Sequence, residues 1–316
     1  MNKLLLIGAI LGGLVLLAVM IVPWLLPRPG LIGEIPEQPF SDSRFAEIAG
    51  VRLHHRARQL DVDSEKPLVI LLHGFASSTF AWRHTLDALG HNGHPVVAVD
   101  LPPFGYSERN GAGSDWPDLI IGLSDTLAPD RTWIVVGHSM GAAVAAEMAA
   151  RRPDQVAELV FVAGTPGMNR RINRLGLWAT RIPSVARAME VLIAHHAITE
   201  DNVFELLQSA YGREPTTEEF EHYYRPLSIP GTYPALIRRL ADRPREPDES
   251  WQTKPVTVIW GEQDQWVPLR VGQDFLEHHP DARFILMESV GHNPMETHPS
   301  EFNRHLFERL HHGLSQ

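Results

Sequence analysis

A serine lies in the pentapeptide GHSMG, residues 137–141, where its flanks could make its hydroxyl reactive. Residues 133–136 favour a β-strand, and residues 142–150 favour a helix. Glycines two positions before and after Ser139 permit the tight backbone of a sharp strand-to-helix turn. The serine oxygen would then lie near a helix N-terminus, where N–H groups stabilise negative charge. Ser139 is therefore a candidate nucleophile for acyl transfer.

Serine acyl transfer needs a base that takes the hydroxyl proton. His292, in the segment VGHNPMETHP, follows the last predicted strand, residues 282–287. A loop in this place lies at the same edge of a parallel sheet as the turn that holds Ser139. Nearby His298 begins the last predicted helix, where a solvated or capping role is expected, so His292 is the preferred base.

A carboxylate must orient that base and support its positive charge. Asp264 lies in VIWGEQDQWVP, directly after the predicted strand 255–260, and Gly261 allows the chain to turn before it. Glu262 is the alternative acid, because it lies in the same loop. The sequence therefore predicts a relay of Ser139, His292 and one of these two carboxylates, with Asp264 preferred.

The tetrahedral intermediate of acyl transfer needs N–H donors for its oxyanion. The segment LLHGFASS follows the predicted strand 67–72, at the sheet edge that would also hold the serine. We expect the backbone N–H groups of Phe75 and Met140 to be these donors, since Met140 starts the helix after the nucleophile. A tight glycine turn with a packed phenylalanine would explain HGF equally well if it stood alone.

Apolar β-branched runs alternate with helical segments after residue 40, which predicts a mostly parallel sheet covered by helices. Two strands are expected first, and the alternation follows. The later strands are expected at 67–72, 95–100, 131–136, 158–163, 255–260 and 282–287, and helices at 79–89, 142–152, 269–279 and 299–311.

The stretch 164–250 interrupts this alternation, because it is helix-like and has no strong strand candidate. We interpret it as an inserted helical cap. Its early part is basic and carries apolar residues, which is compatible with a lid on an anionic membrane or, more simply, with the exposed face of a packed lid. The residues concerned are Arg170, Arg171, Arg174, Leu175, Leu177, Trp178, Arg181 and Arg187.

Residues 4–22 form nineteen consecutive positions without a charged or polar side chain. As a helix they would span about 28 Å, which matches the core of a bilayer. An uncleaved single-pass anchor is the preferred reading over a signal peptide, because no convincing small-x-small cleavage site follows. Lys3 and Arg28 lie on opposite sides of the run, which leaves the orientation in the membrane open.

These observations predict five segments along the chain. They are an N-terminal transmembrane anchor (1–27), a proline-rich stalk (28–39), a first part of the core (40–163), the helical cap (164–250) and a second part of the core (251–316).

Composition excludes several classes of function. A formal net charge of −10 argues against nucleic acid as a partner. The absence of cysteine excludes disulfides and thiol chemistry. The chain has 17 histidines but no HExxH motif, and its adjacent histidine pairs diverge, so no metal and no cofactor are expected. The oligomeric state is left open.

Five segments together resemble the α/β-hydrolase superfamily, in the family's order. They are LLHGFASSTFAW, VAVDLPPFGYSER, VVGHSMG, IWGEQDQWVP and VGHNPMETHP. The resemblance implies an α/β-hydrolase fold with a sheet of about eight strands, a cap after the sixth, and a triad of Ser139, Asp264 and His292. Pro103 stands where many relatives have glycine, and the cap carries no motif that assigns a subfamily.

The leading hypothesis is a membrane-anchored serine hydrolase of carboxylic esters, of lipid or small acyl type, similar to monoacylglycerol-lipase-like enzymes. Serine rather than aspartate at position 139 disfavours the haloalkane dehalogenase and epoxide hydrolase branches, which need a carboxylate nucleophile. Two alternatives stay open. One is a C–C bond hydrolase of ring-cleavage products, which uses the same three residue types. The other is a non-catalytic binding protein of the same fold.

Overall fold

The computed structural model describes residues 3–26, 34–61, 65–167, 179–241 and 248–312. These residues form one eight-stranded sheet in the order β1-β2-β4-β3-β5-β6-β7-β8. The strands are β1 (Ser43–Ile48), β2 (Val51–Arg58), β3 (Leu68–Leu72), β4 (Val96–Val99), β5 (Trp133–His138), β6 (Val156–Val162), β7 (Val256–Gly261) and β8 (Arg283–Met287).

The sheet is mostly parallel. Strand β1 pairs antiparallel with β2, and β2 antiparallel with β4, while the neighbours from β4 to β8 all run parallel. Strands β3, β4, β5 and β7 are buried along their whole length, as their unbroken apolar runs predict. The predicted α/β fold with an eight-stranded sheet is therefore confirmed.

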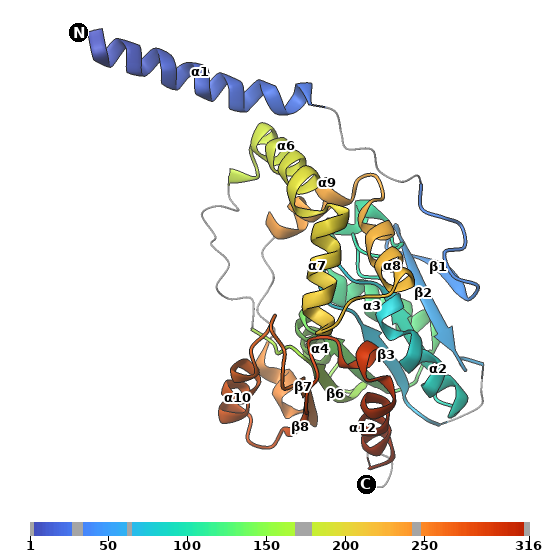
Figure 1. The fold of residues 1–316 in the computed structure, drawn as a ribbon. Coiled ribbons are helices and arrows are strands. Elements are labelled where there is room, and N and C mark those ends of the chain that lie inside the picture. The colour runs from blue at the N-terminus through green and yellow to red at the C-terminus, as the bar shows by residue number, and fades with distance from the viewer. Residues whose placement is uncertain (1–2, 27–33, 62–64, 168–178, 242–247, 313–316) are drawn as a thin grey trace.

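Helices cover both faces of this sheet (Figure 1). One apolar core joins the sheet to α3 (Trp116–Leu127), α4 (Met140–Arg151) and α10 (Leu269–His278). A second core, on the opposite face, joins it to α2 (Arg83–His91) and α12 (Pro299–His312). Smaller elements are the 3-10 helices η1 (Thr79–Trp82), η2 (Arg109–Gly113) and η5 (Glu249–Thr253), and the short helix α11 (Pro294–Thr297).

The described residues between β6 and β7 are helical and include no strand. They form α6 (Pro183–Leu192), α7 (Glu200–Tyr211), α8 (Thr217–Leu227) and α9 (Thr232–Ala241), with a π-helical turn at Ile193–Ala197. Figure 1 shows these helices over one end of the sheet, and we call them the cap. The exact limits of the predicted segments stay predictions.

The basic stretch expected to form an exposed lid is described only in part. Arg170, Arg171, Arg174, Leu175, Leu177 and Trp178 lie outside the described residues. Arg187 is buried, and its side chain forms an ion pair with Glu190 at 2.7 Å. An exposed, lipid-facing role is therefore wrong for Arg187, because its guanidinium is used inside the protein.

Helix α1 (Lys3–Leu25) extends away from the sheet domain in Figure 1. Its C-terminal end contacts α6 of the cap: Trp24 Nε1 donates to Ser184 Oγ (3.2 Å), and Arg187 donates to the carbonyl oxygens of Pro23 (3.1 Å) and Leu26 (3.0 Å). Cations are favourable at helix C-termini, where carbonyl groups lack helical partners. This contact joins the N-terminal helix to the cap.

Within the part of the chain that is described, no helix meets the length and hydropathy needed to cross a membrane. The expected span, 4–22, includes side chains that lie outside the described set.

Candidate active site

Ser139 occupies the sharp turn between β5 and α4. Its backbone has φ +49° and ψ −114°, a conformation that non-glycine residues rarely adopt. A Cβ on Gly137 would lie 2.4 Å from the carbonyl oxygen of Gly141, and one on Gly141 would lie 2.6 Å from that of Leu72. A side chain at either glycine of GHSMG would clash with the backbone, so both positions need glycine, as we expected for a strand-to-helix turn.

A third glycine, Gly164, two residues after the end of β6, supports the same turn. A Cβ there would lie 2.5 Å from the Cα of Ser139. The Ser139 N–H donates to the carbonyl of Val162 at 2.8 Å, which ties the turn to β6. The sequence reasoning missed Gly164, since its role depends on a strand that is neighbouring only in the sheet.

The two expected oxyanion donors lie in suitable backbone positions. Phe75 follows β3 in the segment LLHGFASS, and Met140 is the first residue of α4. Among the described residues, neither backbone N–H donates a hydrogen bond within the protein. Unpaired N–H groups at a helix start and in an adjoining loop are the donors that a developing oxyanion needs.

His292 and Asp264 are brought together as expected. His292 Nδ1 donates to Asp264 Oδ2 at 2.7 Å, and both side chains are almost completely buried. The other carboxylate oxygen, Oδ1, accepts the backbone N–H groups of Trp266 (2.8 Å) and Val267 (2.9 Å). The carboxylate is thus held in one orientation and can fix the tautomer of the imidazole.

The backbone of His292 is held from two sides. Its N–H donates to the carbonyl of Ala210 in cap helix α7 at 2.9 Å. Its carbonyl accepts from Nε2 of His138, the residue before Ser139, at 3.0 Å. The indole of Trp266 stacks on the imidazole with ring centroids 5.4 Å apart. Sequence reasoning named none of these three supports, because each comes from a distant segment.

The structure separates the two preferred residues from their alternatives. The exposed Glu262 accepts the backbone N–H of Ser289 at 3.1 Å, whereas Nδ1 of the His292 imidazole is paired with Asp264. The exposed His298 contacts the hydroxyl of Thr297 at 3.0 Å. Asp264 and His292 are therefore the pair that the fold brings into contact.

Ser139 lies near the pair of Asp264 and His292 but makes no direct hydrogen bond to His292 among the described residues. The rings of His138 and His292 lie 4.8 Å apart between centroids, which places the imidazole beside the elbow. Among the described residues, no hydrogen bond joins the Ser139 hydroxyl to His292. Catalytic hydrogen bonds are often long before substrate binds, so this geometry is compatible with proton transfer in a complex.

Comparison with known proteins agrees with the fold and the site described above. Residues 69–305 match the family model described as the alpha/beta hydrolase family. This chain belongs to the alpha/beta hydrolase family. The matched range includes the parallel strands from β3 to β8, the cap and the candidate site, and so supports a hydrolase.

Similar proteins span different chemistries. The Bacillus subtilis protein named uncharacterized hydrolase YugF is 25% identical over 84% of this chain and 97% of its own length. A 2-hydroxy-6-oxononadienedioate/2-hydroxy-6-oxononatrienedioate hydrolase from Burkholderia vietnamiensis is 26% identical, over 85% of this chain and 95% of its own. A crystal structure of a membrane phospholipase A, described as a bacterial virulence factor, matches with a TM-score of 0.66, 21% identity and full coverage of both chains.

This alpha/beta hydrolase contains a second serine–histidine–aspartate array. The Ser43 hydroxyl contacts His54 Nε2 at 2.8 Å, and His54 Nδ1 donates to Asp100 Oδ2 at 2.7 Å. Asp100 also accepts the backbone N–H of Thr79 (2.6 Å) and of Tyr106 (2.7 Å). Ser43 lies at the start of an ordinary strand rather than in an elbow. The array therefore secures loops, and Ser139 alone of the two serines has the elbow and its adjacent N–H groups.

No group of three or more histidine, aspartate or glutamate side chains that could hold a metal ion occurs in the described ranges.

Stability is expected to fall in mild acid because of two buried histidines. Burial lowers the pKa of His73 and of His138 below the ordinary value of 6.5. Below about pH 6.5 the unfolded chain therefore binds protons at these histidines that the folded protein does not bind. The free energy of unfolding then falls by up to about 1.4 kcal/mol for each histidine and each pH unit of acidification. Urea unfolding at pH 7.5 and pH 5.0 measures this difference. Equal or greater stability at pH 5.0 would contradict the expectation.

Proposed function

We propose that this chain is a serine hydrolase that cleaves carboxylic esters through an acyl-enzyme intermediate. Ser139 Oγ attacks the ester carbonyl carbon, and its proton passes to Nε2 of His292. The N–H groups of Phe75 and Met140 stabilise the oxyanion. The intermediate collapses, and the leaving alcohol takes the proton from His292. A water molecule then attacks the acyl group with His292 as base, which releases the acid and restores Ser139.

One observation supports this proposal most strongly. The imidazole of His292 is held by Asp264 at 2.7 Å and lies beside the strained turn that carries Ser139. A buried, oriented imidazole next to a serine with unpaired N–H groups around it is the arrangement that acyl transfer requires. A binding protein of the same fold would have no need of this combination.

A second candidate, C–C bond hydrolysis, is favoured by the relatives that cleave 2-hydroxy-6-oxo dienedioates. Both reactions can use the same three side chains, so the two candidate functions are distinguished by which substrates the protein turns over. We expect turnover of p-nitrophenyl esters across a chain-length series and none of a vinylogous diketone. Turnover of the diketone alone would favour the C–C hydrolase. A folded protein that neither turns over substrate nor reacts with a fluorophosphonate would favour the binding protein.

We further propose that residues 4–22 anchor the enzyme to a membrane and that its esters are lipid-derived. What supports the anchor is the uncharged run, its helical conformation within α1 and the exposure of its apolar side chains, among them Leu11, Leu14 and Val15. The structural similarity to a membrane phospholipase A points in the same direction. The side of the membrane stays open.

Deleting residues 1–30 is expected to release an active enzyme into solution. The described residues of the removed segment make hydrogen bonds with Ser184 and Arg187 and none with the elbow or with His292, and Arg187 retains Glu190. Full-length protein should sediment with membranes at high speed, and the truncated protein should stay in the supernatant with ester turnover within about twofold. Full-length protein that stays in the supernatant would contradict the anchor.

A further inference from the structure

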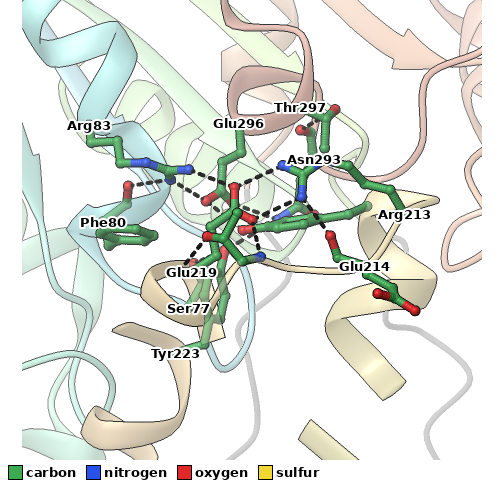
Figure 2. Close-up of polar contacts among 12 residues, drawn as sticks. Ser77, Phe80, Arg83, Arg213, Glu214, Glu219, Tyr223, Asn293, Glu296 and Thr297 are labelled. Atoms are coloured by element: carbon green, nitrogen blue, oxygen red, sulfur yellow. Dashed lines mark hydrogen bonds and ion pairs between the residues drawn. The ribbon is translucent and has the colours of Figure 1, made fainter. Parts of the chain in front are cut away.

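A buried carboxylate, Glu296, collects four hydrogen bonds close to the catalytic histidine. Oε2 accepts from Arg83 (2.6 Å) and Tyr211 (2.9 Å), and Oε1 accepts from Tyr223 (2.6 Å) and Asn293 (2.7 Å). Its side chain is fully shielded from solvent. Figure 2 shows Arg83, Tyr223 and Asn293 around this carboxylate, from separate segments of the chain. Only an ionised carboxylate offers enough acceptor capacity for all four donors.

Two neighbouring residues at the end of cap helix α7 hold the loop of the catalytic histidine at two points. The carbonyl of Ala210 accepts the N–H of His292 at 2.9 Å, and the hydroxyl of Tyr211 donates to Glu296. Gly291 is part of the same contact, since a Cβ there would lie 2.7 Å from the Ala210 carbonyl oxygen. Any shift of α7 therefore moves the backbone of His292.

The hydrogen-bond network around Glu296 also reaches the segment that carries the expected oxyanion donor Phe75. Ser77, two residues further on, donates its hydroxyl to Tyr223 of cap helix α8 at 3.2 Å, and Tyr223 in turn donates to Glu296. Arg83 donates to the carbonyl of Phe80 at 3.2 Å while it binds Glu296. The carboxylate thus connects the cap, the histidine loop and the oxyanion segment.

A second carboxylate of the cap completes the network. Glu219 in α8 accepts from Arg83 at 3.2 Å and from Arg213 at 2.8 and 2.9 Å. Burial, reinforced by the charge of Glu296, raises the pKa of Tyr211 and Tyr223 above the ordinary value of 10, so both hydroxyls stay protonated donors. Arg83 is the cation that the two carboxylates share, and Arg213 supplies a second positive charge at Glu219.

We propose that Glu296 is a positioning residue through which α7 and α8 of the cap set the place of the His292 imidazole relative to Ser139. The proposal rests on the proposed serine-hydrolase function. It assigns the cap a role in catalysis itself, beyond covering the substrate. Because its donors come from α2, α7, α8 and the histidine loop, loss of the carboxylate charge weakens the links between all of these segments at once, although the direct hydrogen bond from the His292 N–H to the Ala210 carbonyl remains.

The test is Glu296→Gln, which keeps the size of the side chain but removes its charge. A displaced base should lower kcat for a p-nitrophenyl ester by about 10- to 100-fold with KM within about twofold, since misplacement by about 1 Å costs this order of rate. Amide hydrogen exchange should become faster in residues 288–297 and at the end of α7. Tyr211→Phe, which keeps the carboxylate, should give a smaller change of the same kind.

The matched control is Glu158→Gln. Glu158 is also buried, pairs with Arg309 and receives a hydrogen bond from Thr257, but it lies near the start of β6, at the opposite end of that strand from the elbow. Its loss should leave kcat and exchange in residues 288–297 unchanged. The proposal is overturned if Glu296→Gln and Tyr211→Phe both keep wild-type kcat, or if Glu158→Gln lowers kcat as much as Glu296→Gln.

The same experiment separates the positioning role of Glu296 from the proposed function. If wild-type protein shows no ester turnover, the serine-hydrolase proposal fails, and the exchange measurement alone tests whether Glu296 links the cap to the histidine loop. Faster exchange in residues 288–297 for Glu296→Gln, but not for Glu158→Gln, then supports the coupling of the cap to the histidine loop. Unchanged exchange in both variants overturns it.

Discussion

Replacing Ser139 with alanine is expected to lower kcat for ester hydrolysis by about 10⁵- to 10⁶-fold, as when the nucleophile of a serine protease is removed. The change removes the oxygen that we propose forms the acyl-enzyme and leaves the proposed oxyanion donors and substrate binding. The elbow already holds a non-glycine residue at φ +49°, so alanine adds no new backbone strain. Stopped-flow and long-time assays with p-nitrophenyl acetate, together with a thermal unfolding curve, measure both effects.

The second array supplies the control for this experiment. Ser43→Ala removes a hydroxyl that also contacts a buried histidine, His54, at 2.8 Å. It should leave kcat within about twofold, because Ser43 has no elbow and takes no part in acyl transfer. If Ser139→Ala retained turnover while Ser43→Ala lost it, the nucleophile would have been assigned to the wrong array.

Asp264→Asn is expected to lower kcat by about 10⁴-fold, as the equivalent change does in serine proteases that keep their geometry. The asparagine can still accept the N–H groups of Trp266 and Val267 through its amide oxygen. Its NH₂ group then faces His292 Nδ1, which favours the tautomer that carries the proton on Nε2. The imidazole can no longer take the proton of Ser139, and its positive form loses its counter-ion.

The matched variant is Glu262→Gln in the same loop. Its carboxylate is exposed and, among the described residues, accepts only the N–H of Ser289, so we expect kcat within about twofold of wild type and an unchanged pH profile. A large loss for Glu262→Gln together with a small loss for Asp264→Asn would reverse the assignment of the acid. Titration of kcat/KM against pH in both variants makes this comparison.

The sheet, and the contact between His292 and Asp264, could be predicted because both depend on local sequence pattern. The buried strands β3, β4 and β5 are visible in the sequence as apolar runs, and Ser139, Asp264 and His292 each lie in the turn or loop that follows a strand. Helix α3 was not foreseen, although Asp115 caps its first turn and Pro117 lies at its start. The run LIIGL in this helix has no polar face, so its periodicity does not distinguish a buried helix from a strand.

The supports of the site could not be predicted in the same way. Ala210 and Tyr211 lie in a cap that carries no recognisable motif, and Glu296 stands in the same segment as His292 without any sign of its four partners. Their roles come from contacts between segments more than seventy residues apart, such as that of Tyr223 with Glu296. A single sequence holds the residue types of these contacts but not their pairing.

The most direct test of the account is to locate the serine that a fluorophosphonate probe modifies in the full-length protein, by tandem mass spectrometry of the labelled peptides. We predict one phosphonylated residue, Ser139, with labelling abolished in Ser139→Ala and strongly slowed in Asp264→Asn. Modification at Ser43 or at another residue, with Ser139 unmodified in folded protein, would contradict the proposed mechanism.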